Sequence, residues 1–241
     1  MCNKFESLHK FNVALREVII LIRRFKLAES KSRTISNIYL KSALILLTSK
    51  FEAFLENVVS EYIDKLNDLL SVEQLPEIIK VHHTKEQMEN FYFCFQKTKE
   101  QDKRNKIINY MKDLSLLWQN DTSAKPIKIS NKFNFGRHGQ EAVNDLFYRI
   151  GFENILDEIT ITEKIKTIDG DEEEQIDFKA KINEITNKRN TIIHNDTSIT
   201  FTKEELICYI QYLKQFSNKL AIMMEEKITE YKNVGIMQES I

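Results

Sequence analysis

Glycine and proline are scarce in this chain, so its fold must manage with few tight turns. The 241 residues include five glycines and two prolines. Together these amount to about 3% of the sequence, where an average protein has about 12%. Sheet-rich folds and doubly wound α/β folds need more turn residues and glycine-rich loops than this. We therefore expect an all-α protein built from long helices with few connections.

Charge and hydrophobic content narrow the class of protein further. The chain has 35 basic and 36 acidic side chains, a formal net charge of −1, and 42% of its residues are hydrophobic. A chain this apolar and this close to neutral can bury a core, which argues against intrinsic disorder. The near-equal numbers of basic and acidic side chains also argue against a protein that binds long stretches of the phosphate backbone of nucleic acid. Any contact with nucleic acid should therefore be local.

The chain shows no sign of a membrane span or of a cysteine-based scaffold. Its longest aliphatic runs, residues 18–22 and 43–47, are far shorter than the ~20 residues that cross a bilayer. No secretory signal pattern opens the chain. Cys2, Cys94 and Cys208 are widely spaced and form no C-x-x-C pair, which disfavours structural zinc and disulfides. We expect a cytoplasmic protein without membrane contact, metal or cofactor.

Apolar side chains recur at helical spacing along most of the chain. The helices that this spacing predicts cover residues 3–27, 35–70, 84–118, 141–150, 176–194 and 202–232. Residues 120–140 have the composition of a loop. Residues 159–168 alternate enough for a short strand, and the acidic residues 169–174 resemble a solvated loop. The pattern predicts a single domain over residues 1–241.

The residues with the clearest chemical potential lie on the penultimate predicted helix. Asn190 and His194 are four positions apart, so they share one face, and Arg189 is one position round from Asn190. His194 falls at the end of this helix, where the macrodipole favours a protonated imidazole. A cationic histidine beside an arginine can bind phosphate and donate a proton. The alternative interpretation is a solvated arginine and a histidine that only caps the helix.

Glu52 is a candidate supporting residue. It lies between Phe51 and Phe54 on the apolar face of the second predicted helix, where an unpaired carboxylate would be costly. It could orient Arg189 or His194, or it could form an ordinary surface contact or structural ion pair. Both interpretations remain open from the sequence.

The other polar or aromatic clusters favour structural interpretations. His82 and His83 have no further ligands at metal-binding spacing, which favours a polar turn. The lysines and arginine of residues 97–112 alternate with acidic residues, as on a solvated helix face. The aromatic residues 91–95 fit a core or an interface better than a platform for stacked bases.

The Arg-x4-His motif, its place on the penultimate helix and the Phe-Glu-x-Phe-Leu pattern at residues 51–55 together resemble the HEPN superfamily. The similarity is greatest to HEPN proteins of the RiboL-PSP type. It extends over about residues 12–70 and 132–224 and leaves residues 73–121 as a possible helical insertion. The resemblance implies a HEPN-like bundle of long antiparallel helices.

The resemblance also implies an activity, metal-independent RNA cleavage by a homodimer in which two Arg-x4-His motifs meet in one cleft. Arg189 would hold the scissile phosphate, His194 would act as acid or base, and Asn190 would position one of them. Such proteins include toxins and phage-defence effectors, so an antitoxin or defence-system partner is implied as well. The alternatives are an inactive HEPN-like module that binds a nucleotide, RNA or a partner, and a helical interaction protein without cleft chemistry.

Overall fold

The computed structural model describes residues 5–134, 138–167, 170–195 and 200–238 of the chain. Over these residues it contains eight helices and one two-stranded sheet. The prediction of an all-α fold is confirmed. None of the helices in this described part is long and apolar enough to span a membrane.

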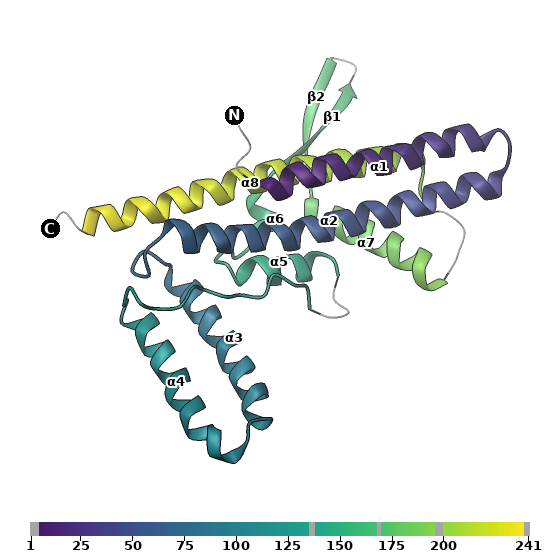
Figure 1. Cartoon of the computed structure of the whole chain (residues 1–241). Helices are drawn as coiled ribbons and strands as arrows, with labels where there is room; N and C mark the ends of the chain where they lie inside the picture. The colour runs from purple at the N-terminus through teal and green to yellow at the C-terminus, as the bar shows by residue number, and fades with distance from the viewer. Residues whose placement is uncertain (1–4, 135–137, 168–169, 196–199, 239–241) are drawn as a thin grey trace.

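Three long helices form the body of the molecule (Figure 1). Helices α1 (Glu6–Glu29) and α2 (Arg33–Leu69) are antiparallel, and α8 (Lys203–Gln238) lies along both. The Oγ of Ser32 caps α2 by accepting a hydrogen bond from the amide of Ile35 at 3.4 Å. The predicted stretches 3–27 and 35–70 match α1 and α2 to within about three residues, because their apolar rows are long and regular. The predicted stretch 202–232 matches the start of α8, which continues six residues further.

Aromatic rings join the three long helices at the centre of the core. The ring of Phe11 on α1 lies 5.0 Å from that of Phe54 on α2. Phe51 of α2 is 6.0 Å from Phe216 of α8, measured between ring centroids. All four rings are at most 5% exposed. The helix that carries Glu52 is therefore held rigidly on its apolar side.

Shorter elements pack around the long helices (Figure 1). They are α5 (Gln140–Tyr148), α6 (Ile155–Glu158) and α7 (Phe178–Asn195). α5 lies along α2 on the side opposite α8 (Figure 1). α7 packs against α2, α5, α6 and α8. The predicted helices at 141–150 and 176–194 are confirmed by α5 and α7.

The expectation of an acidic loop at residues 169–174 is wrong where the structure describes that segment. β1 (Ile161–Thr167) and β2 (Gly170–Ile176) form an antiparallel hairpin. Its register places Ile161 opposite Ile176 and Glu163 opposite Glu174. Residues 171–175 of β2 are acidic or polar, so hydrophobic periodicity did not reveal this strand.

Helices α3 (Glu77–Gln96) and α4 (Glu100–Trp118) form a hairpin that projects from the body (Figure 1). The sequence predicted one irregular helical region here, and missed both the start after Pro76 and the turn at residues 97–99. The polar turn expected at His82 and His83 is also wrong, because both lie within α3. His83 is buried with its Nδ1 atom 2.9 Å from the amide nitrogen of Lys128, and burial lowers its pKa.

Candidate functional site

The candidate site lies on the second half of α7, and the first half fixes that helix in place. An oxygen of Asp177 accepts a hydrogen bond from the amide of Ala180 at 3.0 Å and so caps the start of α7. Phe178, Ile182 and Ile185 follow at helical spacing and are all buried. Phe178 also stacks on Phe216 of α8, with 4.7 Å between ring centroids. The second half of α7 therefore starts from a rigid base.

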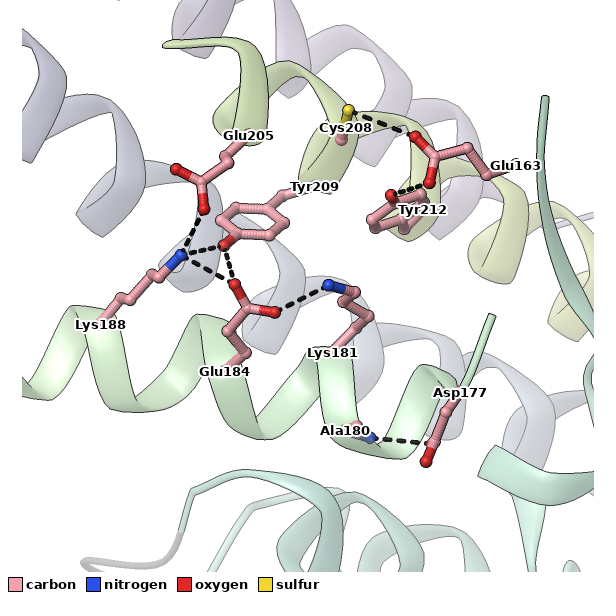
Figure 2. A network of polar contacts seen from close by, with 10 residues as sticks. All are labelled: Glu163, Asp177, Ala180, Lys181, Glu184, Lys188, Glu205, Cys208, Tyr209 and Tyr212. Carbon is pink, nitrogen blue, oxygen red and sulfur yellow. Dashed lines mark hydrogen bonds and ion pairs between the residues drawn. The ribbon is translucent and has the colours of Figure 1, made fainter. Parts of the chain in front are cut away.

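A polar cluster on α7 and α8 continues this anchoring up to the candidate site (Figure 2). The Nζ of Lys188 lies 2.8 Å from a carboxylate oxygen of Glu184 and 2.9 Å from one of Glu205. It also bonds the hydroxyl of Tyr209, which in turn donates to Glu184. Lys181 contacts the other oxygen of Glu184 at 2.9 Å. Lys188 immediately precedes Arg189, so this cluster fixes the backbone next to the candidate site.

The charges in this cluster support one another. Burial alone would raise the pKa of Glu184, but hydrogen bonds from Lys188, Tyr209 and Lys181 outweigh it and lower that pKa to about 2. Burial alone would lower the pKa of Lys188, but its hydrogen bonds to Glu184, Tyr209 and Glu205 outweigh burial and raise it. Both groups therefore stay charged at neutral pH.

Replacing Lys188 with alanine should lower the free energy of unfolding by about 2–3 kcal/mol at pH 7, because it leaves a partly buried carboxylate without its main partner. The pKa of Glu184 falls from an ordinary 4.5 to about 2 on folding. The contribution of the Glu184 carboxylate to the free energy of unfolding is therefore present above pH 4.5 and is lost as the pH falls towards 2. In urea unfolding, the difference in this free energy between wild type and the Lys188→Ala protein should be smaller at pH 3 than at pH 7. Lys214→Ala, at an exposed lysine of α8, is the control, and an equal effect of both variants would contradict the prediction.

Arg189 is the most unusual side chain of the candidate site. It is half-buried, and its Nη1 donates a hydrogen bond to the Oδ1 of Asn190 at 2.8 Å. Its Nε is buried and has no hydrogen-bond partner among the described residues. Within the same residues no carboxylate forms an ion pair with it. A buried donor without a partner costs about 1–3 kcal/mol, which an anion bound to the guanidinium would recover.

His194 lies in the last turn of α7 and is exposed to solvent. It follows Arg189 by five positions, about 7.5 Å along the helix axis at 1.5 Å per residue. It shares a face of α7 with Asn190, as the spacing predicted. Asn190 and His194 therefore form a short polar row on one face near the end of α7, and Arg189 lies about 100° around the helix from Asn190 and about 140° from His194.

Glu52 is paired with a histidine that the sequence did not single out. Its Oε1 lies 2.9 Å from the Nδ1 of His138, and both side chains are about one-third exposed. Among the described residues Glu52 thus contacts His138 and neither Arg189 nor His194, as the structural interpretation of this carboxylate expects.

The Glu52–His138 pair nevertheless lies on the same side of α7 as the candidate row. It borders a small pocket of about 30 Å³ whose wall includes Thr186, and Thr186, Asn190 and His194 follow one another at four-residue spacing on one face. Gly139 lets the backbone next to His138 pass close to Asn183 of α7. A Cβ there would lie 3.0 Å from the Oδ1 of Asn183, and its φ of +87° disfavours other residues.

Two parts of this arrangement escaped prediction because they depend on tertiary contacts. His138 meets Glu52 across 86 positions, and no sequence pattern links the two residues. The contacts of Lys188 with Glu205 and Tyr209 join α7 to α8, and helical spacing on α7 alone does not reveal them. Among the described residues, no group of three or more histidine, cysteine, aspartate or glutamate side chains has an arrangement that could hold a metal ion.

Comparison with known proteins identifies one family. The family described as RiboL-PSP-HEPN matches residues 12–226. No curated protein and no solved structure matches the chain.

Proposed function

Because the chain belongs to the RiboL-PSP-HEPN family, we propose that it is a metal-independent endoribonuclease with its active site at Arg189 and His194. HEPN domains are often ribonucleases. The observation that carries the proposal is the guanidinium of Arg189, which is half-buried, unopposed by any carboxylate among the described residues and left with a free Nε donor. A phosphate supplies both the negative charge and the acceptor oxygens that this group lacks.

The chemistry follows from the groups at the end of α7. RNA can be cleaved by its own 2′-hydroxyl if a base removes the hydroxyl proton and an acid protonates the leaving 5′-oxygen. A cation must also stabilise the charge on the crowded phosphorane. In this proposal Arg189 holds the phosphate and His194 transfers the proton. Asn190 keeps the guanidinium in place through the hydrogen bond at 2.8 Å.

A homodimer would complete this set of groups. One chain offers one His194, whereas the reaction needs an acid and a base, and a two-fold axis near the end of α7 would supply a second copy. An exposed apolar side chain lies beside His194 in the chain, because Ile193 of α7 is 44% exposed.

The direct test is cleavage of single-stranded RNA by the purified protein in the presence of EDTA. We expect products with a 5′-hydroxyl and a 2′,3′-cyclic phosphate, because the internal 2′-hydroxyl is the nucleophile. The same sequence made with 2′-deoxy sugars is the matched control and should stay intact. Loss of cleavage with EDTA, or cleavage of the deoxy substrate, would contradict the mechanism.

The alternative is an inactive member of the family that uses the same cation to bind a nucleotide, RNA or a partner protein. The Arg189 geometry supports phosphate binding whether or not cleavage follows. Absence of RNA cleavage together with nucleotide binding that depends on Arg189 would favour this alternative. An active ribonuclease of this kind would need restraint in its host, so we include a toxin or defence role, with an antitoxin or defence-system partner, in the proposal.

A further inference from the structure

The projecting α3–α4 hairpin carries large apolar side chains that its own two helices leave open. Each is more than two-fifths exposed. Six of them form two rows, and we call these six the hairpin face: Val81 (46%), Met88 (56%), Tyr92 (67%), Ile107 (43%), Met111 (59%) and Trp118 (43%). Phe93 (60%) and Ile108 (52%) are also exposed but lie one position off these rows.

The residues of the hairpin face form one surface. Val81, Met88 and Tyr92 recur at seven- and four-residue spacing along α3, and the other three recur at four- and seven-residue spacing along α4. A shallow groove of about 410 Å³, lined by Val81, Met88 and Trp118 among others, joins the two rows. The indole Nε1 of Trp118 donates to Thr84 of α3 at 3.0 Å and fixes the rows side by side. The face is therefore continuous across both helices.

The hairpin face is large enough for a protein interface. The exposed parts of its side chains add up to on the order of 700 Å² per copy, close to the ~800 Å² that each partner contributes to a standard interface. Methionine, tyrosine and tryptophan are also the side chains enriched at the centres of interfaces. Figure 1 shows the hairpin pointing away from the body of the molecule, so the bundle itself does not cover the face.

The charges at the two ends of the hairpin face indicate what covers it. Glu77 extends the α3 row at the base of the hairpin, four positions before Val81, and Arg104 extends the α4 row towards the tip, three positions before Ile107. Both are exposed. In a two-fold pairing of antiparallel hairpins, the acidic base of one copy lies near the basic tip of the other.

We propose that the hairpin face binds the same face of a second copy of this chain and that the two hairpins form an intermolecular four-helix bundle. Four amphipathic helices with one shared apolar centre are a stable arrangement, whereas two alone leave that centre open. This contact is separate from the pairing at the end of α7. A chain that uses both contacts assembles beyond a dimer, either as a closed tetramer or as an open chain.

Light scattering on the purified 241-residue chain at micromolar concentration tests the hairpin contact. We expect Met88→Glu combined with Met111→Glu to lower the molar mass by half or more, because two charges enter the centre of each apolar face. The control is Ile222→Glu on α8, where the side chain is 57% exposed outside the hairpin, and it should keep the wild-type mass. All three positions are exposed, so circular dichroism should stay helical. Equal masses for wild type and the double variant, a monomer in both included, would overturn the proposal.

A charge reversal tests whether the partner is a second copy. Arg104→Glu should lower the mass, and adding Glu77→Arg to it should restore the mass, because opposite charges again meet across the two-fold axis. Failure of the second change to restore the mass would overturn this pairing. The result is independent of the proposed ribonuclease activity, because the mass changes at the hairpin whether or not the protein cleaves RNA. Conversely, RNA cleavage by the Met88→Glu, Met111→Glu protein would support the α7 site without any hairpin contact.

Discussion

Arg189→Ala should lower the rate of RNA cleavage by about 10³-fold, the loss typical when a group that stabilises transition-state charge is removed. The loss should appear in the rate at saturating RNA, because the guanidinium matters most when charge develops on the phosphorane. Arg189→Lys should recover only part of the rate, because an ammonium keeps the charge but cannot contact two phosphate oxygens in the planar geometry of a guanidinium. The measurement is the initial rate of cleavage of a labelled RNA by wild type and by the Arg189→Ala and Arg189→Lys proteins.

Stability measurements separate this role from a structural one. The Nε of Arg189 is buried without a hydrogen-bond partner among the described residues, so removing the side chain releases an unsatisfied donor. We expect the free energy of unfolding to change by less than about 1 kcal/mol or to rise. Arg16→Ala, at an exposed arginine of α1, is the control for both measurements. A clear loss of stability with unchanged cleavage would make Arg189 a structural residue and remove the basis of the proposed site.

The long helices could be predicted because one sequence feature, the recurrence of apolar residues at helical spacing, determines them. α1, α2 and α8 each present an apolar row for many turns, and glycine and proline are almost absent from them. The α3–α4 turn was missed because residues 97–99 are Lys-Thr-Lys, which contains none of the usual turn residues. The strand β2 was missed because its residues Asp171–Gln175 are acidic or polar and depend on the partner strand β1.

The candidate site was predictable only where its residues are neighbours on one helix. Helix geometry alone places Arg189 beside Asn190 and places His194 on the same face. The Glu52–His138 pair and the Lys188 cluster join segments that only the folded chain brings together. Periodicity carries no information about such contacts, so the sequence could flag Glu52 as an unusual carboxylate but could not name its partner.

His194→Ala should lower RNA cleavage by about 10²- to 10³-fold through loss of an acid–base group. The side chain is exposed in the last turn of α7, so we expect the helical content and the free energy of unfolding to stay near wild type. His9→Ala, at an exposed histidine of α1, is the matched control and should cleave at the wild-type rate. Cleavage by the His194→Ala protein at an undiminished rate would exclude His194 from the mechanism.

Mixing His194→Ala with wild-type protein then tests whether two histidines share one cleft. If the acid and the base come from different chains, a mixed dimer has only one of them and should be inactive. After subunit exchange in an equal mixture, about a quarter of the dimers contain two wild-type chains, whereas half of all chains are wild type. The activity per mixture should therefore fall to about a quarter of that of the same total concentration of wild type. A residual activity of one half would mean that each chain cleaves RNA by itself, and the two-fold active site would have to be abandoned even if Arg189 and His194 are both essential.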